Sequence, residues 1–164
     1  MIKPVTSLLL LLLVFHHALF AKDIVTHKAI SPDLALEMVK YALEACRKEG
    51  YQVTAVVVAR DGAEVALMRD VHASRFTIQI AREKANAVIL SGIASGEFRV
   101  NRRDIQQEMN HVEGLLVLQG GLPIAAGGYQ LGGIGVSGAP GGDRDEKCAK
   151  YALDKVQDRL EFAD

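Results

Sequence analysis

Apolar residues recur at helical spacing near the start of the chain and again near its end. The first set predicts a helix that begins at the capping triplet Ser31-Pro32-Asp33 and ends at Gly50. Its members are Leu34, Met38, Val39, Ala42, Leu43 and Cys46. The second set predicts a terminal helix that begins at Asp143. Its members are Ala149, Ala152, Leu153, Val156 and Leu160.

The segment between these helices predicts a hairpin and one further helix. Residues 53–59 form a β-branched, almost wholly apolar run, which indicates a strand covered on both faces. An Arg-Asp-Gly turn signal at residues 60–62 predicts that residues 63–68 return as a second strand. Apolar spacing predicts a helix within residues 75–93, and the polar residues 99–110 predict a short helix or an ordered loop.

Glycine is concentrated between the polar stretch and the terminal helix. Three short strands separated by Gly-Gly pairs are predicted there, at residues 115–119, 122–126 and 129–136. A strand region so rich in glycine indicates backbone that lies close to another group. The identity of that group is the main question that this region raises.

The predicted element order is α-β-β-α-(α)-β-β-β-α. Hairpin connections favour a mainly antiparallel sheet with the terminal helices on one face. The expected fold class is therefore α/β in the broad sense, of the α+β kind. A chain of 164 residues with 49% hydrophobic content is long enough for one core, so residues 22–164 are predicted to form a single domain.

Residues 1–21 are predicted to be a signal peptide. Lys3 precedes an apolar run at residues 8–15, and the segment ending at Ala21 fits a processing site. The run is shorter than the roughly 20 residues of a membrane span. We therefore expect a periplasmic or secreted protein that starts near Lys22 and has no stable membrane span once the signal is cleaved; an uncleaved membrane tether is the alternative.

Two compositional features bear on partners and redox state. The net charge of −1 and the absence of Trp argue against a nucleic-acid partner. Cys46 and Cys148 both fall on apolar faces of predicted helices. We favour two buried free thiols, because buried Cys behaves as a small hydrophobic residue. A disulfide, which an oxidising compartment permits, is the alternative.

The glycine-rich region contains motif matches that we interpret as coincidental. Residues 133–138 match G-x-G-x-x-G, but these glycines lie within a predicted strand and no helix begins inside the motif. Ser137 does not fit a nucleophile elbow, and no catalytic residue is predicted. Ser137 and Gly138 lead toward a helix N-terminus, where backbone N–H groups favour an anion. Capping of that helix by its own Asp143 is the interpretation that we prefer.

His72 stands where the second strand turns toward the second helix, close to Arg69, Asp70 and Arg75. Imidazole can ligate iron and guanidinium groups pair with carboxylates, so the combination suits a large anionic cofactor such as haem. A solvated side chain is the alternative for any single His in an exposed loop. Further candidate axial ligands, each also explained by core packing, are Met38, Met68 and Met109.

Several segments are similar to the GlcG/HbpS family of haem-binding proteins. The Gly-Gly-Leu-Pro-Ile run at residues 120–124 and the glycine-rich residues 132–143 with the Asp-Glu-Lys-Cys-Ala run that follows resemble its C-terminal signature. Residues 69–73 and 80–85 resemble its middle segment. The resemblance implies a profilin-like fold, with a five-stranded antiparallel sheet flanked by helices, and assembly into homo-oligomers.

The resemblance also implies binding of haem, with another tetrapyrrole or a corrinoid as alternatives. We expect His72 to be the metal ligand, with Arg69, Arg75 and Lys84 as partners of the propionates. The candidate cofactor-binding residues are His72, Arg69, Arg75, Lys84, Ser137 and Gly138. Two other functions stay open, a haem-degrading enzyme and a non-catalytic assembly module. Residues 73–77 lack a second His and residues 84–87 lack a hydroxyl that similar branches carry, which bears on ligand identity.

Overall fold

The computed structural model describes residues 27–161, so the predicted signal peptide lies outside the described residues. The helices are α1 (Pro32–Lys48), α2 (Phe76–Ser91), α3 (Ser95–Asn101), α4 (Gln106–Met109) and α5 (Gly142–Glu161). The strands are β1 (Thr54–Ala59), β2 (Glu64–Arg69), β3 (Gly121–Ala126) and β4 (Tyr129–Ser137). None of the helices in this part of the chain has the length and hydropathy of a membrane span.

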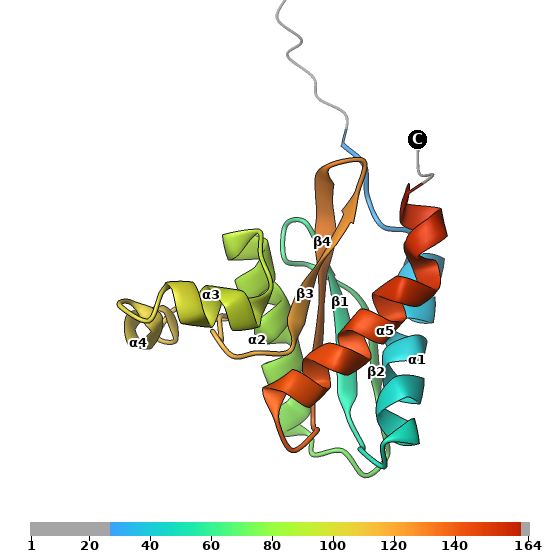
Figure 1. Ribbon diagram of the computed structural model, residues 1–164, viewed down its shortest axis with the longest axis horizontal. Helices are drawn as coiled ribbons and strands as arrows, with labels where there is room; N and C mark the ends of the chain where they lie inside the picture. The colour runs from blue at the N-terminus through green and yellow to red at the C-terminus, as the bar shows by residue number, and fades with distance from the viewer. Residues whose placement is uncertain (1–26, 162–164) are drawn as a thin grey trace, which may run out of the picture.

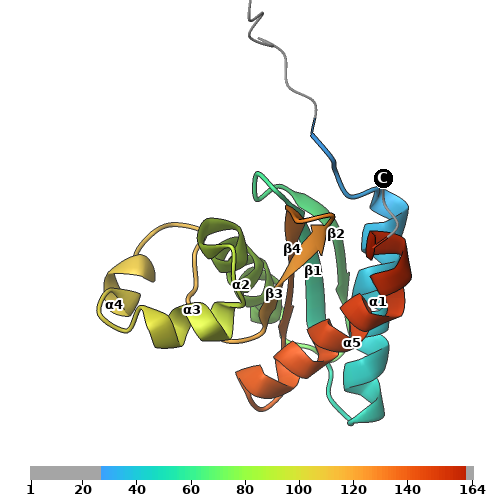
Figure 2. The same ribbon diagram turned by 45° about the horizontal axis from the view of Figure 1, so that its top comes forward.

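The four strands form one antiparallel sheet in the order β2-β1-β4-β3. β1 pairs with β2 through the predicted hairpin and on its other side with β4, where Thr54 lies opposite Ser137. Helices α1 and α5 pack side by side on one face, α2 covers the other, and α3 and α4 project to one side (Figures 1 and 2). The α+β class and the placement of the terminal helices are confirmed.

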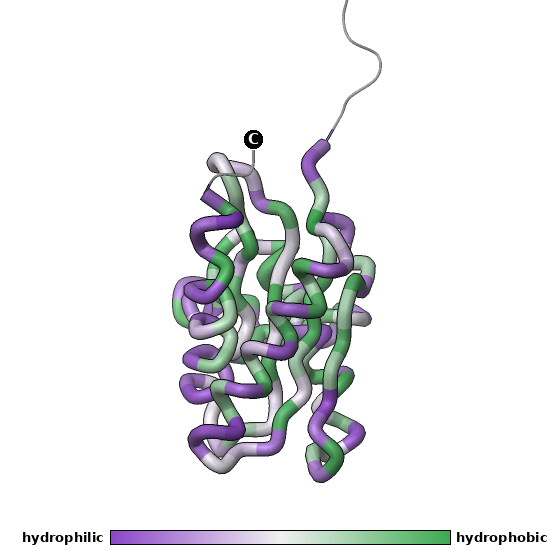
Figure 3. The backbone as a smooth tube through the Cα atoms, turned by 90° about the vertical axis from the view of Figure 1, so that its right-hand side faces the viewer, coloured by the Kyte–Doolittle hydropathy of each residue, from purple (hydrophilic) through white to green (hydrophobic). Residues whose placement is uncertain are grey.

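Both terminal helices begin close to their predicted positions. The Ser31 hydroxyl accepts the Leu34 N–H at 3.2 Å, and Pro32 occupies the first helical position. Helix α5 begins at Gly142, one residue before Asp143. Figure 3, which views the molecule from the side of α1 and α5, shows hydrophobic and hydrophilic positions alternating along the chain.

Strand β1 separates two hydrophobic cores. Ala55 and Val57 join the larger core beneath α1 and α5, whereas Val56 and Val58 pack against α2. All four side chains are fully buried. The prediction of a strand covered on both faces is confirmed, and it explains why this run lacks the polar alternation of a half-exposed strand.

The predicted fifth strand at residues 115–119 is wrong. The backbone there bonds to other partners: Leu116 donates its N–H to a carbonyl of α2, and Val117 donates to the side chain of Asn110. The Val117 side chain is buried beside Phe98 of α3. The apolar character of this segment therefore reflects burial rather than strand pairing. Two short helices precede it, so the order is α-β-β-α-α-α-β-β-α.

The glycines of β3 and β4 lie against the backbone of α2. A Cβ on Gly121 would collide with the carbonyl oxygen of Lys84, and one on Gly135 with the carbonyl oxygen of Ala81. Glycine is required at such positions because the helix and sheet approach more closely than a side chain allows. The group close to the glycine-rich backbone is thus a helix of the same domain. The glycines of the G-x-G-x-x-G match that lie in β4 are therefore explained by the close packing of α2 on the sheet.

The prediction of two free thiols is wrong, because Cys46 of α1 and Cys148 of α5 form a disulfide. Their Cα atoms are 5.5 Å apart, although 102 positions separate them in the sequence. Each cysteine does lie on the apolar face of its helix, as expected. The spacing within each helix carries no information on which helix packs beside it, and that packing decides the pairing.

Candidate functional site

Most of the candidate residues lie at one end of the molecule, where α1, β2 and β4 end and α2 and α5 begin (Figure 1). The carboxylates of Glu49, Asp70 and Asp143 belong to the same region. It also holds six basic residues, and we call it the cationic end. These are Arg47, Lys48, Arg69, Arg75, Arg144 and Lys147.

Asp70 fixes the turn between β2 and α2. Its carboxylate is buried, accepts the backbone N–H of Val53 at 3.0 Å and accepts a hydrogen bond from Nε of Arg47 at 2.7 Å. The guanidinium of Arg69 donates to the backbone carbonyls of Asp70 and Ala73, which closes the turn. The backbone that carries the candidate ligand is therefore held on both sides.

His72 projects from this turn into solvent, and exposed apolar side chains lie on both sides of it in the sequence. Val71 is 79% exposed and Phe76 is 57% exposed, which is unusual for large hydrophobic residues. The guanidinium of Arg75 lies 4.1 Å from the centre of the Phe76 ring. An imidazole, an aromatic ring and guanidinium groups thus come from one short surface segment.

Lys84, predicted to be a partner of the propionates, lies in the interior and not on the surface that this role requires. It is 1% exposed, and its ammonium donates to Asp145 at 2.7 Å and to the Val136 carbonyl at 3.0 Å. Burial lowers the pKa of Lys84 and raises the pKa of Asp145, and in each case the charge of the partner opposes the shift. The pair connects α2 with β4 and α5 in the interior, away from the exposed His72.

Ser137 and Gly138, two further candidate binding residues, are also surrounded by other parts of the protein. Ser137 is buried at the end of β4. Gly138 has a φ of 135°, and a Cβ there would collide with the backbone of Gln52. The backbone N–H of Ala139 donates to Asp145 at 2.9 Å. A carboxylate of α5 therefore accepts a backbone N–H of this turn; that carboxylate belongs to Asp145, whereas the preferred interpretation of the sequence assigned the cap to Asp143.

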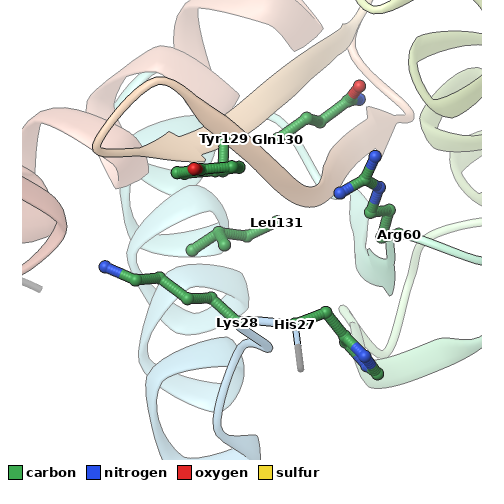
Figure 4. Close-up of a pocket in the computed structure, with 6 residues that line it drawn as sticks. All are labelled: His27, Lys28, Arg60, Tyr129, Gln130 and Leu131. Atoms are coloured by element: carbon green, nitrogen blue, oxygen red, sulfur yellow. The ribbon is translucent and has the colours of Figure 1, made fainter. Parts of the chain in front are cut away.

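Two of the cavities formed by the described residues lie at opposite ends of the sheet, and His72 lines neither of them. The first, of about 400 Å³, is bounded by side chains from the β1–β2 turn, the start of β4 and residues 27–28 (Figure 4). Its lining residues are His27, Lys28, Arg60, Tyr129, Gln130 and Leu131. The second, of about 530 Å³, lies at the cationic end between α1 and α5. Within residues 27–161, no group of three or more His, Cys, Asp or Glu residues is placed to hold a metal ion.

The second cavity contains residues that the sequence reasoning did not single out. We call it the tyrosine cleft, and its polar lining consists of Lys48, Glu49, Tyr51, Arg144, Lys147 and Tyr151. A signal was available on α5, because Arg144, Lys147 and Tyr151 follow each other at intervals of three and four residues and so share one helix face. The apolar spacing of α5 predicts the helix but does not indicate this polar stripe.

Solved structures with the same architecture include HbpS of Streptomyces reticuli, crystallised as a double mutant. It is 28% identical with a TM-score of 0.76, and the alignment covers 83% of this chain and 92% of that chain. ORFY of Klebsiella pneumoniae is 20% identical with a TM-score of 0.77, covering 84% of this chain and 97% of that one. PduOC, solved in complex with haem, is 22% identical with a TM-score of 0.70, covering 77% and 94%. The last two comparisons show the fold alone.

The family comparison extends over most of the chain. A search of curated proteins found no match. A protein-family profile described as "Haem degrading protein HbpS-like" matches residues 30–154. The resemblance found in the glycine-rich and middle segments is thereby confirmed, and the chain belongs to the HbpS-like family.

Proposed function

We propose that this protein is exported and binds haem or a closely related tetrapyrrole at the turn between β2 and α2. The observation that carries the proposal is the exposed combination of His72, Phe76 and Arg75 on a backbone held by Asp70 and Arg69. The family match supports it, and so does the haem complex of PduOC, which shares the fold.

These residues fit the chemistry of such a group. A tetrapyrrole supplies a metal centre, a flat apolar ring and acidic side chains when it is bound. The imidazole of His72 offers a nitrogen ligand, and the exposed Phe76 offers an apolar contact surface. The guanidinium of Arg75 offers donors for a carboxylate. We leave Lys84 and Ser137 out of the proposed contact set, since both are buried.

Haemin titration tests the role of His72. We expect haemin to give a shifted Soret band with the purified protein, and we expect His72→Ala to weaken binding by about tenfold or more, because an axial ligand is lost. His111→Ala is the matched control, since His111 is an exposed histidine in another loop. A Soret band that is unchanged in His72→Ala, or equally reduced in His111→Ala, would remove His72 from the site.

The same titration distinguishes binding from degradation. The family description names haem degradation, so a reductant is added to the haem-loaded protein. Loss of the Soret band together with a ring-opened product would add an enzymatic role to the proposed one. A stable reduced spectrum would support binding alone.

The Cys46–Cys148 disulfide supports the proposed export. Structural disulfides persist in oxidising compartments and are rare in the cytosol. The predicted signal peptide at residues 1–21 and the disulfide are independent features of the sequence and of the fold. Together they favour a periplasmic or secreted location.

We further propose that the protein forms a homo-oligomer through the projecting α3–α4 arm (Figure 2). Val100 on α3, Leu90 near the end of α2 and Val112 beyond α4 are each about half exposed or more. We expect a second copy of this chain to cover these exposed apolar side chains, because most soluble oligomers are built from identical subunits. Light scattering should give a mass above that of one chain and a lower mass for Val100→Asp; a monomeric wild type would refute this assembly.

A further inference from the structure

The tyrosine cleft is formed where two helices meet beside the disulfide. Lys48 comes from the end of α1, Tyr51 from the segment after it, and Arg144, Lys147 and Tyr151 from the first turns of α5. Cys148 lines the same cavity, so the disulfide fixes the two walls relative to each other. Its volume of about 530 Å³ falls within the range typical of small-molecule sites.

Each tyrosine in the cleft is paired with a basic side chain. Arg144 donates to the Tyr51 hydroxyl at 2.5 Å, and its guanidinium lies 5.5 Å from the centre of that ring. Lys48 donates to the Tyr151 hydroxyl at 3.2 Å and lies 5.0 Å from that ring centre. The hydrogen bond from Lys48 lowers the pKa of Tyr151. Both aromatic walls therefore carry positive charge at their hydroxyl ends.

The positive charge of the cleft is not neutralised by salt bridges within the described part of the chain. None of the ion pairs there involves Lys48, Arg144 or Lys147. Glu49 contributes the one carboxylate to the lining, so three cations face one anion. In a chain with a net charge of −1, this is a local excess of positive charge that favours an anionic ligand.

The cleft and the His72 turn are linked through one ion pair between a half-exposed Arg47 and the buried Asp70. Arg47, next to Lys48 in α1, pairs with Asp70, which lies two residues before His72. Asp70 also accepts the N–H of Val53, two residues after Tyr51. Both features therefore belong to the same end of the molecule (Figure 1), and the contacts of Asp70 link the segments that carry them.

We propose that the tyrosine cleft is the seat for the carboxylate-bearing edge of the tetrapyrrole, with Arg144 and Lys147 as its anion partners and Tyr51 and Tyr151 as its aromatic walls. The inference rests on the proposed function and adds a second set of contacts to the same end of the molecule. Basic groups beside aromatic surfaces recognise molecules that are both flat and acidic. His72 supplies a metal ligand, whereas the cleft needs no metal in its ligand.

Iron-free protoporphyrin IX separates these two contributions. We expect Arg144→Gln/Lys147→Gln to weaken binding of both protoporphyrin IX and haemin by about tenfold, because charge-assisted hydrogen bonds to the carboxylates are lost. We expect His72→Ala to weaken haemin alone, because protoporphyrin IX has no iron to ligate. Porphyrin fluorescence gives the affinity. Tyrosine emission gives the location, since the chain has no Trp and two of its four tyrosines line the cleft.

The controls make the test specific to the cleft. Lys40→Gln/Arg99→Gln removes the same charge from exposed positions on α1 and α3 and should leave both affinities unchanged. Lys147→Glu changes a single exposed residue and replaces the double variant if that variant folds poorly. It should also weaken the binding of both ligands. Wild-type affinity in both cleft variants, or an equal loss in the control, overturns the inference and leaves the proposed function standing. A wild type that binds neither ligand overturns both.

Discussion

Replacing Cys46 and Cys148 together with Ala should lower the free energy of unfolding by about 2–5 kcal/mol. The bond closes a loop between residues 102 positions apart, and the chain-entropy expectation for a loop of about 100 residues is roughly 4.7 kcal/mol. Domains are typically stable by about 5–15 kcal/mol, so the loss is a large share of the total. Urea unfolding of the variant and the wild type measures it.

Reduction of the wild type provides the control. In dithiothreitol the wild-type protein should approach the stability of the double variant, since both then lack the constraint on the unfolded chain. A difference below about 1 kcal/mol between oxidised wild type and variant would contradict a stabilising bond of this loop length. Alkylation under denaturing conditions of protein taken directly from cells tests export as well, because a cytoplasmic location predicts two free thiols and an oxidising one predicts none.

Lys84→Met should destabilise the protein by about 3–5 kcal/mol, because it leaves the carboxylate of Asp145 buried without a counter-ion. Both side chains are at most 4% exposed, so solvent does not replace the lost partner. Lys84→Met/Asp145→Asn should recover part of the loss, since the amide oxygen still accepts the N–H of Ala139. Denaturant unfolding of the four proteins in this cycle gives the coupling energy.

The loss in Lys84→Met should also depend on pH. Burial raises the pKa of Asp145 above its ordinary 3.8, and removing Lys84 removes the charge that opposes this shift. The folded state then binds more protons than the unfolded state between 3.8 and the raised pKa. Stability of the variant should therefore fall as pH rises through that window and level off above it, relative to wild type.

An exposed ion pair on α5 serves as the comparison. Lys150 and Asp154 are also 2.7 Å apart, but each side chain is more than half exposed. Lys150→Met should cost only about 0.3–0.5 kcal/mol, with no comparable pH dependence. Equal losses in Lys84→Met and Lys150→Met would show that burial of the Lys84–Asp145 pair has no energetic weight.

The candidate site could be predicted from sequence only where its residues are close together in the chain. His72, Arg69 and Arg75 lie in one turn, and the structure places them on one surface segment. The resemblance predicts the same role for Lys84 as for Arg69 and Arg75, but the helix that carries Lys84 turns it toward Asp145 in the interior. The tyrosine cleft joins residues 93 and 103 positions apart, so the polar stripe on α5 indicates one wall and only the fold brings the other wall beside it.

The features of the fold also differ in whether the sequence alone could predict them. The sequence by itself determined the helices α1 and α5, the β1–β2 hairpin and the glycine-rich strands, because capping residues, apolar periodicity and turn signals act between neighbours in the chain. Tertiary structure alone decided the loss of the fifth strand at residues 115–119, the Cys46–Cys148 bond and the burial of Lys84. Each of these depends on which distant backbone or side chain supplies a hydrogen bond, a sulfur or a charge, and only packing brings those groups together.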